Sequence, residues 1–193
     1  MWVYPICMGW MHESDTHLHE AALVAVFEDG AVSHGSTMVE GVDYETVETG
    51  RYRDEDRRRP SAEIVGWLLT CDCARRSSSA VSSWTDPVQW ARVPSVSLED
   101  LTSHRVFAPD TDLDVNVRRE VAEAAQAVWR REHLDPIDVD YEIRTAADAR
   151  KNADAQLDAA VAKARRLGRS WADIGAAAGM TRQSANERWK GRG

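Results

Sequence analysis

The sequence has too few cysteines for a disulfide framework, since Cys7, Cys71 and Cys73 are the only three. Such an odd and sparse set is typical of proteins from a reducing compartment, so we expect a cytoplasmic location. No stretch approaches the roughly 18 uninterrupted apolar residues of a membrane span. Residues 1–20 lack the basic leader and long apolar run of a signal peptide. These absences predict an intracellular protein with no membrane partner.

Motifs of common catalytic sites are also missing. We find no phosphate-cradling glycine loop, no H-E-x-x-H zinc motif and no G-x-S-x-G nucleophile elbow. Acidic runs such as residues 109–116 (PDTDLDVN) lack the glycine and terminal glutamate of a calcium loop. We therefore expect a protein that is not an enzyme.

Positive charge is scarce overall, but it is concentrated at one end. The net charge is −8, which by itself argues against a nucleic-acid partner. From Lys151 to Gly193, however, nine Lys and Arg stand against four Asp and Glu, a local charge of +5 that leaves −13 for the rest. A basic segment on an acidic body is the pattern expected when one part of the chain meets phosphates.

The sequence predicts an α+β fold with a β-rich acidic domain over residues 1–110. Residues 21–27 (AALVAVF) and 64–71 (IVGWLLTC) are short apolar runs typical of strands, and Glu28-Asp29-Gly30 is a turn signal. The other predictions here are a returning strand at 31–39, an alternating strand at 44–52, and exposed connections at 51–60 and 74–87.

A helical linker is expected over residues 111–144. Residues 115–134 carry Val117, Val121, Ala124 and Val128 at helical spacing. Asp114 or Asn116 could cap this helix, Asp135-Pro136 should end it, and residues 137–143 are a candidate edge strand.

Residues 145–193 are predicted to form a long helix followed by shorter ones. The long helix carries a narrow stripe at three- and four-residue spacing, made of Ala146, Ala149, Ala153, Leu157, Ala160, Ala164 and Leu167. Such a stripe could pack on the helix's own domain or on a second copy of the chain. A homodimer is therefore one possible state.

The segment after this helix has the pattern of a helix-turn-helix. Gly168 can end the long helix, and Ser170 with Asp173 approximates a capping box. Gly179 supplies a turn that needs positive φ, and Thr181 can cap a last helix that runs to about Lys190. The predicted inward side chains are Trp171, Ile174, Met180, Ala185 and Trp189, with Gly175 beneath the first helix.

The outward face of the last helix carries side chains suited to DNA. Arg182 pairs well with guanine, Gln183 and Asn186 with adenine, and Glu187 can accept from cytosine. Side chains suited to phosphates surround them, namely Arg169, Ser170, Thr181, Ser184, Arg188, Lys190 and Arg192.

The run SWADIGAAAGMTRQSANERW resembles the helix-turn-helix of sigma-factor region 4 and related bacterial regulators. It is especially similar to a version found in actinobacterial proteins, in which MTRQ opens the recognition helix. The resemblance covers about residues 154–190 and implies that this helix lies in the major groove. Ala177 and Ala178 depart from the pattern, because larger aliphatic residues are frequent there. The remaining parts of a sigma factor are missing, so polymerase function is not implied.

Two further groups of residues leave alternatives open. Cys71 and Cys73 could bind zinc together with Cys7, His17 and His19 if the amino terminus folds back, with His12 as another possible ligand. They could equally be a reactive thiol pair or inert, so no cofactor is required. Trp67, Trp84 and Trp90 could line a ligand pocket or fill the core.

The sequence as a whole predicts a sequence-specific double-stranded DNA-binding protein in transcriptional control, from a bacterium, phage or mobile element. The alternative is a protein-interaction module, antitoxin-like or a phage accessory protein, whose acidic N-terminal domain binds a partner. A nucleic-acid enzyme is a third possibility that the missing motifs disfavour.

Overall fold

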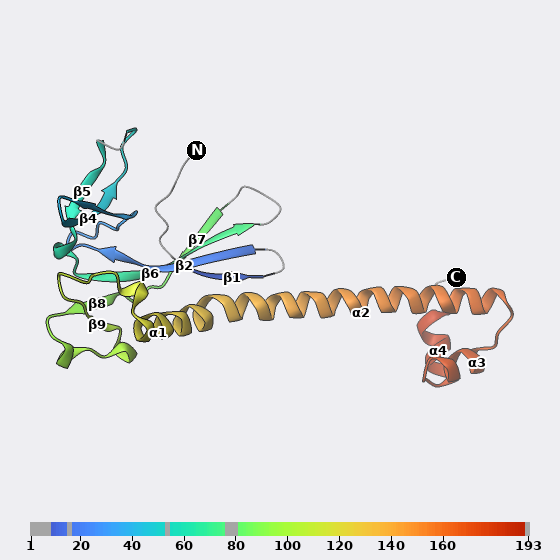
Figure 1. The fold of residues 1–193 in the computed structure, drawn as a ribbon. Coiled ribbons are helices and arrows are strands. Elements are labelled where there is room, and N and C mark those ends of the chain that lie inside the picture. Colours follow the sequence, from blue (N-terminus) through green and yellow to red (C-terminus); the bar gives the residue numbers. More distant parts are fainter. Residues whose placement is uncertain (1–8, 15–16, 53–54, 76–80, 192–193) are drawn as a thin grey trace. The chain divides into compact units, whose positions relative to one another are not determined.

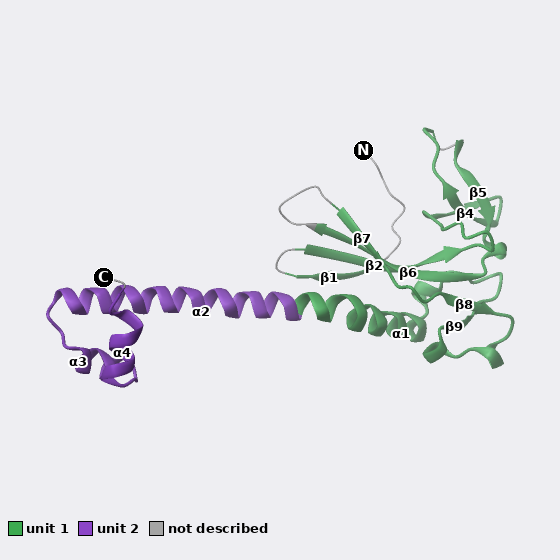
Figure 2. Ribbon diagram, turned by 180° about the vertical axis from the view of Figure 1, so that it is seen from behind, with its two compact units in different colours: residues 1–138 green, residues 139–193 purple. Residues whose placement is uncertain are grey.

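The computed structural model describes residues 9–14, 17–52, 55–75 and 81–191. The chain divides into two compact units, Met1–Asp138 and Val139–Gly193 (Figure 2). In the described residues, the first unit holds all the strands and the second is helical. The chain is therefore a mixed α+β protein, as the sequence predicted.

A six-stranded sheet forms the frame of the first unit (Figure 1). Its order is β1-β2-β6-β8-β9, and β7 pairs with β6. The strands are β1 (Trp10–Glu13), β2 (His17–Val26), β6 (Gly66–Arg75), β7 (Val81–Thr85), β8 (Trp90–Val93) and β9 (Arg105–Phe107). The antiparallel pair β2–β6 is the longest ladder, running from His17 opposite Arg75 to Val26 opposite Gly66. Since side chains alternate along a strand, one face of this ladder is buried, with His19, Ala21, Leu23 and Ala25 on β2 and Trp67, Leu69, Cys71 and Cys73 on β6.

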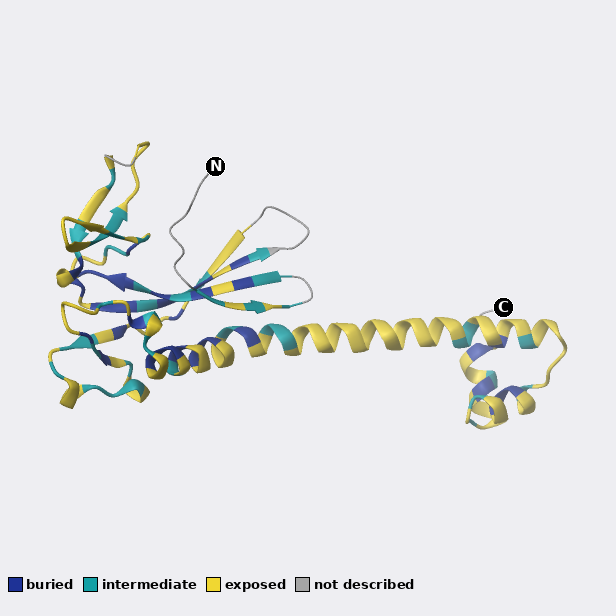
Figure 3. Ribbon diagram, in the orientation of Figure 1, coloured by how far each residue is buried: buried dark blue, intermediate teal, exposed yellow. Residues whose placement is uncertain are grey.

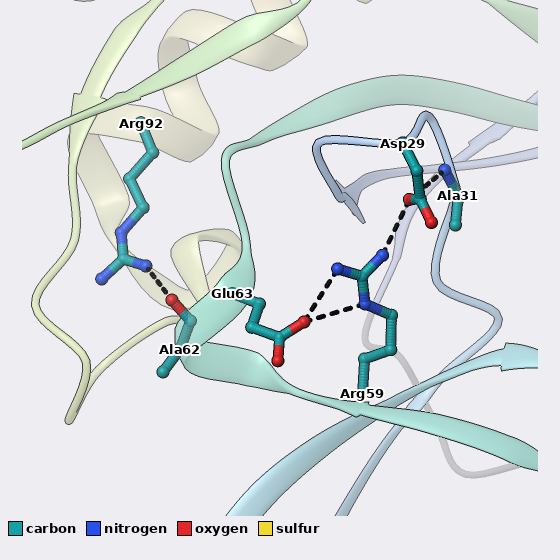
Figure 4. A network of polar contacts seen from close by, with 6 residues as sticks. All are labelled: Asp29, Ala31, Arg59, Ala62, Glu63 and Arg92. Carbon is teal, nitrogen blue, oxygen red and sulfur yellow. Dashed lines mark hydrogen bonds and ion pairs between the residues drawn. The ribbon is translucent and has the colours of Figure 1, made fainter.

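A smaller sheet follows the order β3 (Ser36–Val39), β4 (Val42–Glu48), β5 (Arg57–Pro60). Arg59 of β5 donates to Glu63 Oε2 at 2.8 and 2.9 Å and to Asp29 Oδ1 at 2.7 Å, and its guanidinium lies over the Phe27 ring. Figure 4 shows this network, in which Asp29 also accepts from the Ala31 N–H. The arginine therefore joins the small sheet to the turn that follows β2.

A second arginine binds the main chain next to this network. Arg92 of β8 donates to the carbonyls of Ala62, Ile64 and Ala108 (the first is drawn in Figure 4). It thereby binds the 3-10 turn Ser61–Glu63 and the residue that follows it. Further 3-10 turns in the described part of the chain are Val96–Leu98, Leu101–Ser103 and Val115–Val117.

The core of the first unit lies between the large sheet and the helical segment that follows it (Figure 3). Trp67 and Trp90 are 2% and 0% exposed, and Trp84 packs partly buried against them. These tryptophans therefore fill the core, which was one of the two alternatives. Each fully buried tryptophan contributes roughly 1.5–3 kcal/mol or more through apolar burial.

The helical segment begins at α1 (Arg119–Trp129), passes through a π-helical turn (Arg130–Leu134) and continues as α2 (Asp135–Arg166). Two predictions are wrong here. Asp135-Pro136 does not end a helix, and residues 137–143 are helical rather than an edge strand. The Asp135 N–H donates to the Arg130 carbonyl, five residues back. This wider turn directly before Pro136 accommodates a ring that would clash with the carbonyl four residues back in a regular helix.

The start of α1 also differs from the prediction. Val117 is 63% exposed rather than on the buried face. Asp114 caps the 3-10 turn, and Asn116 exchanges two 2.9 Å hydrogen bonds with the backbone of Leu23. Asn116 thus ties this turn to β2 instead of capping the helix.

Three strand predictions need correction. The returning strand at 31–39 makes only a single bridge, Val26 to Val32, before β3 leaves to pair with β4. Arg57–Pro60 and Val81–Thr85 were expected in exposed connections but form β5 and β7. Arg57–Pro60 (RRRP) has an unfavourable composition for a strand, so its pairing with β4 rather than its own residues decides its structure.

The second unit contains most of α2 with α3 (Trp171–Ala177) and α4 (Arg182–Trp189). The long helix begins at Asp135, earlier than the predicted Thr145, and residues 139–156 are exposed (Figure 3). The predicted stripe is not one buried seam. Leu157 and Ala164 pack inward around the buried Val161, whereas Ala146, Ala149, Ala153, Ala160 and Leu167 are exposed.

Among the described residues, no helix is both long enough and apolar enough to cross a membrane.

Candidate nucleic-acid interface and a buried cysteine–histidine cluster

The two C-terminal helices begin at well-formed caps. The Ser170 hydroxyl accepts from the Asp173 N–H, and the Asp173 carboxylate accepts from the Ser170 N–H at 3.2 Å. The Ser170 hydroxyl, which also donates to Asp173 Oδ2 at 2.9 Å, and the Ser170 N–H hold the pKa of Asp173 below its usual value. Thr181 caps α4 by accepting from the Ser184 N–H at 3.1 Å. The predicted capping box and Thr181 cap are confirmed.

A close backbone approach fixes how α3 meets the turn. Gly175 is buried in α3, and a Cβ built there would lie 2.8 Å from the Met180 carbonyl oxygen and 3.0 Å from that of Thr181. The turn itself contains Gly179 at φ +68°, a conformation that is strained for other residues. Gly175 is therefore required because there is no space for a side chain, and Gly179 because of its positive φ.

The buried face of α4 packs against α2. Ala185 and Trp189 are buried with Ile174 and Val161, while Met180 and Trp171 pack at the edge. The Trp189 indole N–H donates to Asp158 Oδ1 at 2.6 Å. This contact anchors α4 to the long helix through a charge-assisted hydrogen bond, which is stronger than a neutral one.

The opposite face of α4 is exposed and carries the predicted base-reading residues. Arg182, Gln183 and Glu187 are exposed, and Asn186 is half-buried. The Gln183 amide donates to Glu187 Oε1 at 2.8 Å. Arg182 makes no side-chain hydrogen bond or ion pair with any described residue.

The predicted phosphate-contacting residues fall into two groups. Lys190 is exposed at the C-terminal end of α4, and Ser184 is exposed in its first turn next to the Thr181 cap. Arg188 instead pairs with Asp154 at 2.8 Å, and Arg169 lies 3.8 Å from Asp173. Arg192 lies outside the described residues. Two of the predicted cations are therefore partly neutralised within the unit itself.

A second group of functional side chains lies in the first unit. His19 of β2, Cys71 and Cys73 of β6, and His133 of the π-helical turn bring four nitrogen and sulfur ligand atoms within 4.8 Å of one another. The Cys71 Sγ lies 3.8 Å from both Cys73 Sγ and His19 Nδ1, and Cys73 Sγ lies 3.2 Å from His133 Nε2. The first three residues are buried and His133 is partly buried.

The strand register explains how the cluster forms. Cys71 and Cys73 are two residues apart on one strand, so both face the same side. His19 lies directly opposite Cys73 in the β2–β6 ladder. The helical segment covers this face and supplies His133, whose ring stacks on Trp84 with centroids 4.8 Å apart.

Burial keeps all four groups uncharged on their own. Desolvation, reinforced by His133, His17 and His12, lowers the pKa of His19 to about 4. Burial likewise lowers the pKa of His133 and raises that of Cys73. It raises the pKa of Cys71 to about 12, although the neighbouring indole N–H of Trp129 opposes this rise.

Comparison with family models, curated proteins and solved structures found no match. The chain's own geometry therefore carries the functional argument.

The cluster differs in membership from the predicted metal ligands. His19, Cys71 and Cys73 lie within it, whereas Cys7 is outside the described residues. His17 is not among the four, although its ring lies 5.8 Å from that of His19. His133 was missed, because nothing in its local sequence separates it from an ordinary residue near a helix end. Only the contact between helix and sheet reveals it.

Proposed function

We propose that α3 and α4 form a helix-turn-helix and that this chain is a sequence-specific double-stranded DNA-binding protein. Its role would be transcriptional control, without catalysis, in a bacterium, phage or mobile element. The observation that carries this proposal is the two-sided character of α4. Ala185 and Trp189 are buried, while Arg182 and Gln183 are exposed. The resemblance of the same residues to sigma-factor region 4 supports it.

The chemistry of the exposed face fits base recognition in the major groove. A glutamine amide has two N–H donors and one oxygen acceptor. One Gln183 donor is held by Glu187, so the other donor and the oxygen remain for the N7 and N6 edge of adenine. Glu187 is thus proposed as a positioning residue. Arg182, without an internal partner in the described chain, is available for guanine.

Phosphate contacts are assigned to the ends of α4. Lys190 is exposed and has no ion pair with the described residues, so it can approach the DNA backbone. Ser184 and the Thr181 cap offer hydroxyl groups near the first turn. Arg188 is held by Asp154 and contributes less than its charge suggests.

We further propose that DNA is bound as a homodimer. One helix-turn-helix covers a short half-site, and a symmetric pair reaches two major grooves about 34–36 Å apart. Leu157 belongs to the packed core of the second unit, so it is not available as a dimer seam. The exposed alanines of α2, such as Ala149, are the residues through which a helical seam would have to form.

The test is DNA selection from a random library by the full chain, followed by fluorescence anisotropy on the selected site at several salt concentrations. We expect affinity to fall steeply with salt. Arg182→Ala and Asn186→Ala should each lose about 1–3 kcal/mol of discrimination against the mutated base pair. Lys190→Ala should weaken all sequences alike.

Arg150→Ala is the matched control, because it removes one exposed positive charge from α2 without touching α4. It should leave sequence preference unchanged. Unaltered preference in Arg182→Ala would contradict the assigned reading face. No DNA binding even at low salt would overturn the proposal and favour the protein-interaction alternative for the acidic first unit.

A further inference from the structure

We propose that His19, Cys71, Cys73 and His133 bind one zinc ion as a structural Cys2His2 site. The site is independent of the DNA-binding proposal. It lies in the first unit and would join β2, β6 and the π-helical turn after α1 at a single point.

The spacing of the ligand atoms matches tetrahedral zinc. With Zn–S of about 2.3 Å and Zn–N of about 2.0–2.1 Å, a tetrahedron places two sulfurs about 3.8 Å apart and sulfur and nitrogen about 3.6 Å apart. The observed Cys71–Cys73 and Cys71–His19 separations are both 3.8 Å, and Cys73–His133 is 3.2 Å. Binding therefore requires only small side-chain adjustments.

The charge balance also favours zinc. Two thiols release two protons when they bind the ion, and the two thiolates then cancel its charge of 2+. The buried site becomes neutral overall, which avoids the large cost of burying a net charge.

Two buried groups lack hydrogen-bond partners, and a bound metal would give one of them, the Trp129 indole, a better acceptor. His19 is 1% exposed, yet its Nε2 has no hydrogen-bond partner among the described residues. The Trp129 indole N–H is similarly unpartnered and lies near Cys71. Buried polar groups are nearly always satisfied. Zinc would bind His19 through the Nδ1 that faces Cys71 and would leave Nε2 as the N–H of the ring. A metal-bound thiolate would be a better acceptor for the indole than a neutral thiol.

A disulfide between Cys71 and Cys73 is a less favourable alternative than zinc binding. Both are free thiols in the structure. Residues two apart on an extended strand have Cα atoms about 6.7 Å apart, at the long end of the roughly 4.4–6.8 Å that disulfides span. The fourth protein ligand also closes the coordination shell, which is typical of structural rather than catalytic zinc.

The experiment measures metal in the full chain, purified without a polyhistidine tag and with a non-chelating reductant. We expect one zinc per chain by elemental analysis. Replacing zinc with Co²⁺ should produce thiolate-to-cobalt charge-transfer bands and the strong d–d absorption of a tetrahedral site. Purified protein that holds no zinc and gives no such spectrum would overturn the proposal.

Variants then assign the ligands. Cys73→Ser and His133→Asn should each weaken zinc binding by more than about a hundredfold, beyond what loss of an outer partner costs. His17→Asn is the matched control, because it lies two residues from His19 on the same strand and should retain the metal. Tetrahedral Co²⁺ retained in both Cys73→Ser and His133→Asn would refute the ligand set.

If those variants fail to fold, the wild-type spectrum still decides the case through its thiolate bands. Removal of zinc by a chelator should also reduce hydrogen-exchange protection in β2, β6 and the π-helical turn, but not in α3 and α4. None of these measurements involves DNA, so their failure would not bear on the proposed function.

Discussion

Replacing Gly175 by alanine should weaken the second unit, although alanine favours helices. In an exposed helix interior this change would stabilise by about 0.5–1 kcal/mol. At Gly175, however, the new Cβ would lie 2.8 Å from the Met180 carbonyl and 3.0–3.1 Å from the Thr181 carbonyl group. These atoms are backbone, so the turn itself must move, at a cost of about 1–3 kcal/mol for overpacking.

The net expectation is a loss of about 1–2 kcal/mol, a factor of roughly 5–30 in the equilibrium for local opening. Hydrogen exchange followed by mass spectrometry on full-length protein measures this directly in peptides covering residues 165–191. Exchange in the β2–β6 ladder should stay unchanged and serves as the internal control.

Gly179→Ala is the matched variant, because nothing lies within 4 Å of its built Cβ and only its φ of +68° opposes the change. Its expected cost is about 1–2 kcal/mol from backbone strain alone. If hydrogen-exchange protection of residues 165–191 in Gly175→Ala equals or exceeds that of the native protein, the close approach of α3 to the turn is refuted.

Three further outcomes are expected. Ala149→Glu should dissociate a dimer formed through α2 but leave a dimer formed elsewhere intact, as measured by light scattering at micromolar concentration. Asp154→Asn should release Arg188, so DNA affinity should rise and its salt dependence should steepen in anisotropy titrations. Ser170→Ala should lower the helix stability by about 0.5–2 kcal/mol. In the native protein, the depressed pKa of Asp173 makes the capping box most effective above the ordinary aspartate pKa of 3.8. The capping box weakens progressively as pH falls through the lower folded pKa, which hydrogen exchange measured against pH can follow.

The second unit was largely predictable because its signals are local. Caps such as Ser170 and turn glycines such as Gly179 act over three or four residues, so their spacing in the sequence indicates where the helices begin and end. The resemblance carried by the same residues added the expected role of α4. What the sequence did not provide was the pairing of Arg188 with Asp154, because that depends on how α4 packs on α2.

The first unit was harder, because its decisive contacts join distant residues. The polar strand Arg57–Pro60 is held by its pairing with β4, and the returning strand predicted at 31–39 is replaced by β3 pairing elsewhere. His133 lies 60 residues from its closest cluster neighbour, Cys73, so no motif spacing could join them. Cys71, Cys73 and His19 were already candidate ligands from the sequence, and only His133 required the fold.

The π-helical turn at Arg130–Leu134 has a consequence for insertions and deletions. It contains one residue more than a regular helix would use over the same span. Deleting a single residue within this turn would leave a continuous helix with better hydrogen bonds and keep α2 in register, but it would remove the wide turn that places His133 beside Cys73. The imidazole would then leave the cysteines while the helix remained intact. Point substitutions should therefore be tolerated more readily in this segment than a change of length.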